Sequence, residues 1–264
     1  MNIALIASAW RLIASIAGLL IFSAWEIKQP SHKLAENRLR HYLRNISLGI
    51  TNTLIMQIVM TSGVVAYYNF LTERNFGILN LLRLPSLANV VLSLIFLDFI
   101  TYIWHRAYHE VPLLWRLHKV HHTDLDLDVT SASRFHVGEI IVSTVFKMAI
   151  GFLWGPGAFA LALHETFLFA AAQFHHSNIK LPEPWESRLR AVIVTPDIHH
   201  IHHSSINTQT DSNYSNLFSI WDRLLGSYTS PANVSQETIV YGLKSYPDFK
   251  DVTLPKLLAM PFIN

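Results

Sequence analysis

Residues 84–109 read LPSLANVVLSLIFLDFITYIWHRAYH. These residues join a predicted membrane helix to a predicted metal site, because an apolar run long enough to cross a bilayer, about 20 residues, ends directly in His105 and His109. Positions three and four apart share one face of a helix, so Asp98 and Tyr102 lie on the face of these histidines. An acid inside a membrane helix is expensive and usually functional. We therefore expect Asp98 either to accept a hydrogen bond from a metal-binding histidine or to cap a polar group at the membrane edge.

Two further histidine boxes follow with matching spacing. They are His118-Lys-Val-His121-His122 and His199-His-Ile-His202-His203. The chain contains no cysteine, so a metal must be bound by imidazole, carboxylate or backbone groups. Neutral imidazole suits iron, zinc, copper and nickel, and a structural zinc ion takes four ligands. The three boxes therefore predict more than one metal ion.

The composition is typical of a membrane protein, with 51% hydrophobic and 14% charged residues in 264. A net charge of +2 is too small to suggest a nucleic-acid partner. We expect an N-terminal transmembrane region over 1–97, with helices at about 3–25, 45–70 and 80–104, the last of which continues past the end of that region. The first run competes with a signal peptide, but its basic residues follow the apolar run instead of preceding it. We therefore favour a retained anchor.

The topology follows from the positions of the charged residues. Lys and Arg are concentrated between residues 28 and 44, and such an excess beside a span marks the cytoplasmic side. We expect His32 and His41 there to be solvated loop residues. Two apolar stretches joined by Gly155-Pro156-Gly157 predict a membrane hairpin over 139–174. The predicted fold is all-α: an integral membrane, multi-pass helical bundle with a cytosolic helical cap that carries all three boxes on the cytoplasmic side.

Several familiar site motifs are missing from the sequence. There is no Glu-x-x-His, which excludes the carboxylate-bridged di-iron bundle. There is no His-Glu-x-x-His either, because His164-Glu165 lacks the second histidine of a zinc protease. No Gly-rich dinucleotide motif precedes a helix.

The ordered set of motifs resembles the sterol desaturase / fatty acid hydroxylase superfamily, from about Asp98 to Tyr228. The motifs are His105-Arg-x-x-His109, His118-x-x-His121-His122, Arg134-Phe-His136-x-x-Glu139, His176-x-Asn178, Pro196-x-x-His199-x-x-His202-His203 and Asn213-Tyr214 with Ile220-Trp221-Asp222-Arg223-Leu-Leu-Gly226. The resemblance implies a catalytic domain over 98–230, followed by a C-terminal tail over 231–264. It also implies an O2-dependent membrane di-iron enzyme, with two Fe per chain that zinc replaces in some purified proteins. Such an enzyme hydroxylates or desaturates a C–H bond of a lipid, sterol or fatty-acyl substrate.

The resemblance also assigns roles to individual residues. The implied metal ligands are His105, His109, His118, His121, His122, His176, His199, His202 and His203. His136 either joins them or closes the site, since Val137 replaces a family proline. Asp98, Glu139 and Asn178 are expected to hydrogen-bond to the ligands. We expect His175 and His200 to support ligands or lie at the surface, His164 to be a satisfied core residue, and Trp221 and Asp222 to pack and cap.

Two questions remain open at the level of sequence. A metal transporter or storage protein would also place imidazoles near a bilayer, although transport sites usually lie near its midplane. A non-catalytic relative retaining zinc is the other alternative. Hydroxylation and desaturation share their first step, and we favour hydroxylation. Because the chain has no flavin, haem or iron–sulfur motif, electrons must come from a separate ferredoxin, cytochrome b5-like protein or reductase.

Overall fold

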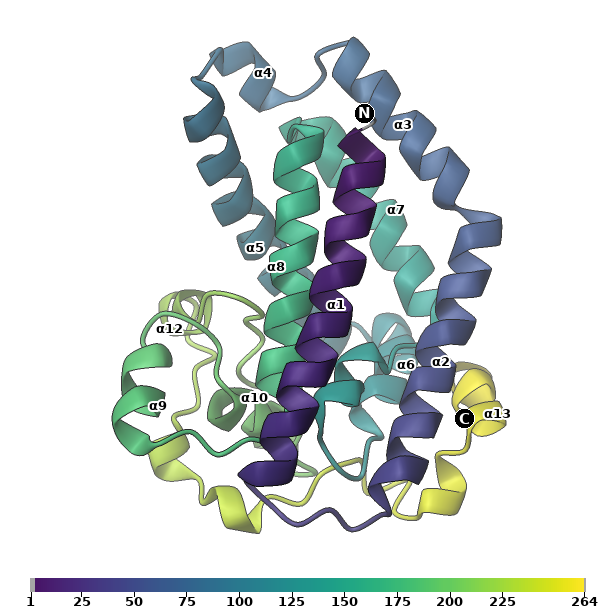
Figure 1. Cartoon of the computed structure of the whole chain (residues 1–264), viewed down its shortest axis with the longest axis vertical. Helices are drawn as coiled ribbons and strands as arrows, with labels where there is room; N and C mark the ends of the chain where they lie inside the picture. Colours follow the sequence, from purple (N-terminus) through teal and green to yellow (C-terminus); the bar gives the residue numbers. More distant parts are fainter. Residues whose placement is uncertain (1–2, 264) are drawn as a thin grey trace.

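The computed structural model describes residues 3–263 and is built from helices arranged in two tiers (Figure 1). The long helices form the upper tier, and α1 and α2 continue down into the lower tier, which also holds the end of α5 and most of the short helices (Figure 1). Within residues 3–263 the only β-structure is three isolated bridges. The helices of the upper tier are α1 (Ile3–Lys28), α2 (Arg38–Val59), α3 (Thr61–Glu73), α4 (Ile78–Leu82), α5 (Ser86–Glu110), α7 (Val137–Trp154) and α8 (Ala158–His176).

The lower tier is made of shorter elements. They are α6 (Pro112–His122), η1 (Val129–Ser133), α9 (Glu183–Leu189), α10 (Pro196–His202), α11 (Asn207–Thr210), α12 (Ile220–Leu224), η2 (Pro231–Asn233), η3 (Gln236–Thr238), η4 (Phe249–Asp251), α13 (Leu254–Ala259) and η5 (Met260–Phe262). Residues 231–263 are tied into this tier, because Val252, Leu257 and Met260 form a buried core with Leu48 of α2 and Val120 of α6.

Local sequence explains where the main helices begin and end. The Asn37 side chain accepts hydrogen bonds from the backbone N–H groups of Leu39 and Arg40 and so caps α2. Pro112 stands in the first turn of α6, where its missing N–H costs nothing. The chain therefore turns between α5 and α6 without leaving the region of His105 and His109.

The long helices correspond to the apolar runs, with two differences. The helix expected at 80–104 begins at Ser86 as α5, and residues 78–82 form the separate helix α4. The run expected at 45–70 is divided between α2 and α3 at Met60. The expected turn at 155–157 does separate α7 from α8, and Gly155 there has φ +73°. Among the residues that the structure describes, two helices, α5 and α7, are long and apolar enough to cross a membrane.

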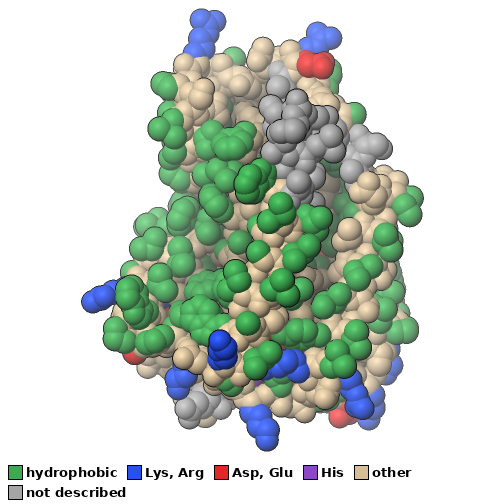
Figure 2. Space-filling model, viewed as in Figure 1, with side chains coloured by type: hydrophobic (Ala, Val, Ile, Leu, Met, Phe, Trp, Pro, Cys, Tyr) green, Lys and Arg blue, Asp and Glu red, His purple; other side chains and the backbone are tan. Residues whose placement is uncertain are grey.

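The outer surface of the upper tier is apolar. Leu12, Ile16 and Leu20 of α1 are exposed, as are Leu54 of α2 and Leu87 of α5. Figure 2 shows hydrophobic side chains over this face, with Lys and Arg gathered toward the two ends of the molecule. An apolar belt between charged ends fits a helical bundle embedded in lipid.

Candidate metal centre

The structure brings nine histidines into two groups at the lower ends of the long helices. The five-histidine group is His105, His109, His118, His122 and His202, and the four-histidine group is His121, His176, His199 and His203. In each group the candidate ligand atoms all lie within 4.8 Å of one another. These nine are the residues for which the sequence predicted metal ligation.

The histidines of the second and third boxes are divided between the two groups. His118 and His122 of α6 are four apart and share a face, while His121 belongs to the other group. The third box divides in the same way, with His199 and His203 in the four-histidine group and His202 in the other. Each box therefore contributes to both groups, except the first, which supplies only the five-histidine group.

Backbone carbonyls fix the tautomer of four rings. Nδ1 of His105 lies 2.7 Å from the carbonyl oxygen of Tyr214, and Nδ1 of His121 lies 3.1 Å from that of Arg134. Nδ1 of His176 lies 2.8 Å from the carbonyl oxygen of Ala172, and Nδ1 of His202 lies 2.7 Å from that of Ser212. A carbonyl oxygen only accepts hydrogen bonds, so Nδ1 carries the proton and Nε2 is left with a lone pair.

These Nε2 lone pairs face each other. Nε2 of His202 lies 3.1 Å from Nε2 of His105, and Nε2 of His176 lies 3.1 Å from Nε2 of His121. Two acceptors cannot form a hydrogen bond, so each contact needs a cation between or beside the rings. Within residues 3–263, Nε2 of His109 and of His118 has no hydrogen-bond partner either. The donor set therefore fits bound metal ions.

Burial keeps histidines of the second and third boxes in the neutral form that binds metal. It lowers the pKa of His121, His122, His199 and His203 well below the usual value, and the neighbouring imidazoles lower it further. For His202 burial lowers the pKa to about 3. A metal site assembled here does not have to displace protons from these rings at neutral pH.

Two carboxylates support ligand rings. Oε1 of Glu139 lies 2.8 Å from Nδ1 of His118, as expected for a carboxylate that orients a ligand. Oδ1 of Asp211 lies 3.3 Å from Nδ1 of His109, which the sequence did not indicate. Asp211 belongs to a loop, and no helical spacing relates it to the box.

Three other expected contacts are not formed. Asp98 takes the second of its two expected roles, because it accepts hydrogen bonds from Phe218 N–H and Trp221 Nε1–H and binds no ligand ring. Asn178 instead bonds the backbone at residues 31 and 32. His136 lies outside both groups, because its Nδ1 accepts from Gly138 N–H and caps α7. Each of these side chains accepts a hydrogen bond from a backbone N–H group, and the spacing of side chains along the sequence does not predict such contacts.

Among the remaining predicted roles, some agree with the structure and one is partly wrong. Asp222 caps the loop whose Tyr214 carbonyl holds His105, accepting from the backbone N–H groups of Tyr214 and Ser215. The expectation for His164 was half wrong: the ring is buried, but neither nitrogen has a hydrogen-bond partner in the described chain. His175 is also buried, with its ring centroid 3.8 Å from that of His199.

Two more histidines lie apart from the groups. His200 is buried, and its Nδ1 lies 3.0 Å from the Tyr241 hydroxyl. His41 is not a solvated loop residue: it is fully buried between Asp124 and Asp128. The signal for this was present, because His41 and Asn45 share a helix face and three aspartates alternate at 124, 126 and 128.

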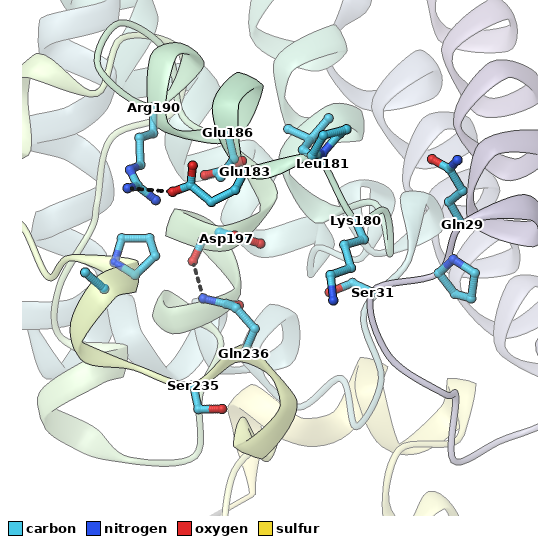
Figure 3. A pocket seen from close by; sticks show the side chains of 14 residues that line it. Gln29, Ser31, Lys180, Leu181, Glu183, Glu186, Arg190, Asp197, Ser235 and Gln236 are labelled. Atoms are coloured by element: carbon cyan, nitrogen blue, oxygen red, sulfur yellow. Dashed lines mark hydrogen bonds and ion pairs between the residues drawn. The ribbon is translucent and has the colours of Figure 1, made fainter.

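A surface cavity of about 730 Å³ lies between the α1–α2 connection, α9, the start of α10 and residues 231–236 (Figure 3). Its charged lining includes Lys180, Glu183, Glu186 and Arg190, and none of the nine grouped histidines lines it. Glu186 accepts a 2.5 Å hydrogen bond from Thr195, the residue that precedes α10. This wall of the cavity therefore supports the helix of the third box from outside the metal site.

Known proteins share this region of the chain. An ornithine lipid hydroxylase of Rhizobium tropici is 32% identical over 160 residues, which cover 59% of this chain and 46% of that protein. Alkylglycerol monooxygenase is 31% identical in Homo sapiens, covering 55% of this chain and 31% of that protein. The alkylglycerol monooxygenase of Danio rerio is 28% identical, and the match covers 78% of this chain and 44% of that protein.

The chain thus spans less than half the length of these relatives. No solved structure matches it. The family profile described as fatty acid hydroxylase matches residues 90–227, which is just over half of the chain and contains all nine grouped histidines. The chain belongs to the fatty acid hydroxylase family.

Proposed function

We propose that this protein is an O2-dependent membrane di-iron enzyme that hydroxylates a C–H bond of a lipid. The observation that carries the proposal is the pair of 3.1 Å contacts between Nε2 lone pairs, one in each histidine group. In the proposal each group holds one iron ion. Bound iron would supply the O2 activation that an unactivated C–H bond requires.

The chain's own residues would hold, orient and shield this centre. The carbonyls of Tyr214, Arg134, Ala172 and Ser212 keep four rings in one tautomer and direct Nε2 inward. Glu139 does the same for His118 with a carboxylate, which makes that ring a stronger donor. The near-complete burial of the rings excludes bulk water from the centre.

Lipid and electrons would reach the centre from different sides. The exposed apolar faces of α1, α5 and α7 favour sideways entry of a lipid between helices that end near the histidines. Inserting one oxygen atom and reducing the other to water takes a pair of electrons and a pair of protons. A separate ferredoxin, cytochrome b5-like protein or reductase would deliver the electrons at the cytoplasmic cap, whose placement rests on the Lys and Arg of residues 28–44.

Isotope-labelled O2 tests the reaction directly. The full chain, reconstituted in vesicles of total lipid with a reduced ferredoxin, is exposed to ¹⁸O2, and the lipids are then analysed by mass spectrometry. We expect one lipid class to gain a single ¹⁸O atom with wild-type protein and to gain none with His203→Ala. Loss of two hydrogens without label would make the enzyme a desaturase, and no change in any lipid would remove the enzymatic proposal.

The relatives' names connect this reaction to polar lipids of more than one type. One relative is named for an ornithine lipid and the other for alkylglycerols. We therefore propose a lipid substrate for this chain and leave its class to the same lipid census. Desaturation is the second outcome that the census can distinguish, because it changes the mass of the lipid in the opposite direction.

A further inference from the structure

His41 lies in a charged pocket of its own beside the second histidine box. Its Nε2 is 2.8 Å from Oδ1 of Asp124, and its Nδ1 is 2.5 Å from Oδ2 of Asp128. All three side chains are fully buried. Ionised carboxylates only accept hydrogen bonds, so both ring nitrogens must donate and the ring is an imidazolium.

The electrostatic balance agrees with this assignment. Burial alone lowers the pKa of His41, but the charges and hydrogen bonds of Asp124 and Asp128 outweigh it and raise the pKa to about 10. The ring therefore stays charged across the physiological pH range.

Asp124 is linked to Arg134 through the side chain of Asn45. Oδ2 of Asp124 accepts from Asn45 Nδ2–H at 3.1 Å, and Oδ1 of Asn45 accepts from Nη1–H of Arg134 at 2.8 Å. Arg134 is itself fully buried, and its Nη1 lies 3.8 Å from Oδ1 of Asp124. The guanidinium thus depends on partners that His41 holds in place.

Arg134 in turn clamps the end of α6. Its Nε–H donates to the Val120 carbonyl at 3.1 Å, and its Nη2–H donates to the Thr123 hydroxyl at 3.1 Å. Its own backbone carbonyl accepts from Nδ1–H of His121 at 3.1 Å. One residue therefore fixes both the helix turn that carries His121 and the tautomer of the His121 ring.

The charges of Asp124 and Asp128 are cancelled only when His41 is cationic, whereas the third buried aspartate, Asp126, accepts hydrogen bonds from the backbone N–H groups of Ala35 and Glu36. His41 and Arg134 balance Asp124 and Asp128, while the surrounding charges form their own pairs, Arg38–Glu26 at 3.3 Å and Arg44–Glu36 at 2.7 Å. Removing one partner of a buried ion pair leaves an uncompensated buried charge, which strongly destabilises the arrangement.

We propose that His41 is a positioning residue for the four-histidine group, acting as a buried cation that holds Asp124 and Arg134 and, through the Arg134 carbonyl, the ring of His121. The inference rests on the proposed metal centre, although no atom of His41 touches a ligand ring in the contacts above. Its chemical requirement is a positive charge at position 41, whereas a neutral side chain of similar size cannot supply it.

Four variants of the full chain separate charge from shape. His41→Gln keeps hydrogen-bonding groups but removes the charge, and His41→Arg keeps the charge on a longer side chain. His41→Gln with Asp128→Asn removes one charge of each sign, and the amide oxygen that Asp128→Asn leaves in place can still cap η1. His32→Gln is the matched control, because His32 lies in the α1–α2 connection just before the helix of His41, and its ring faces Tyr241.

The readouts are metal ions per chain, metal affinity and the visible spectrum of the cobalt(II)-substituted protein, which reports ligand geometry directly. We expect His41→Gln to weaken binding of one of the two ions about 10- to 100-fold, the usual effect of disturbing a ligand's supporting contacts, and to shift the cobalt spectrum. His41→Arg and His32→Gln should keep both ions and the wild-type spectrum. The double variant should recover binding lost in His41→Gln, including any lost through misfolding.

The inference is overturned if His41→Gln binds both ions with an unchanged spectrum, or if His41→Arg loses as much as His41→Gln. It is also overturned if the double variant recovers nothing. Wild-type metal content tests the proposed function and comparison among the variants tests His41, so the two failures are distinguishable.

Discussion

At the scale of single residues, the metal centre is defined by proton positions as much as by histidine positions. Nδ1 of His105, His121 and His202 donates to a carbonyl supplied by a distant loop or turn, at Tyr214, Arg134 and Ser212. The acceptors, which are backbone atoms, leave no signature in side-chain spacing. The sequence therefore predicted which rings meet, but not why their Nε2 atoms point inward.

Glu139 gives the sharpest prediction at this scale. Glu139→Ala removes the carboxylate that lies 2.8 Å from Nδ1 of His118, which weakens that ring as a donor. We expect metal affinity of the five-histidine group to fall about 10- to 100-fold, measured by competition with a chelator. Glu139→Gln should lose less, because the amide carbonyl still accepts. Equal affinity in Glu139→Ala and wild type would show that the contact does not tune the ligand.

The errors at this scale share one cause. Asp98 and Asn178 lie on faces or beside motifs that suggested ligand support, yet backbone N–H groups of other segments bind them. His41 was mistaken for a solvated residue for the converse reason, since its partners Asp124 and Asp128 lie more than eighty positions away. Helical periodicity predicts contacts within an element and is silent about contacts between elements.

At the scale of helices, the α7–α8 hairpin depends on a backbone contact that only glycine allows. Gly155 has φ +73°, and a Cβ there would collide with the Phe76 carbonyl oxygen and lie 2.9 Å from Cα of Gly77. The sequence Gly-Pro-Gly at 155–157 was enough to predict the turn. It could not predict that the α3–α4 connection packs directly on it.

Replacing Gly155 should therefore destabilise the hairpin. The left-handed conformation alone costs a non-glycine residue roughly 1–2 kcal/mol, and the contact with Phe76 adds to it, so we expect Gly155→Ala to lower the thermal unfolding midpoint clearly. Gly157→Ala is the matched control, because Gly157 has φ −62° and nothing lies within 4 Å of its added Cβ. A smaller effect at Gly155 than at Gly157 would contradict this packing.

At the scale of the whole molecule, the three boxes meet because the long helices carry them to one end. The sequence predicted this from span counting, and Figure 1 shows the end of α5 together with α6 and α10 in the lower tier. The division of the 45–70 run at Met60 was not predicted, since hydropathy has no term for a helix break within an apolar run.

Membrane orientation can be mapped with single cysteines, because the chain has none of its own. Lys250→Cys lies in the lower tier and Glu73→Cys at the opposite end, and both wild-type residues are exposed. In intact cells we expect an impermeant maleimide to label Glu73→Cys and to label Lys250→Cys only after permeabilisation. The reverse pattern would place the histidine groups on the outer side.

Counting metal ions is the most direct test of the central claim that two histidine groups hold two ions. The full chain is purified anaerobically, and iron and zinc are measured per chain for wild type, His105→Ala and His121→Ala. His105 belongs only to the five-histidine group and His121 only to the four-histidine group. We expect two ions in the wild type and the loss of one in each variant. Fewer than two ions in the wild type, or no loss in His121→Ala, would contradict it.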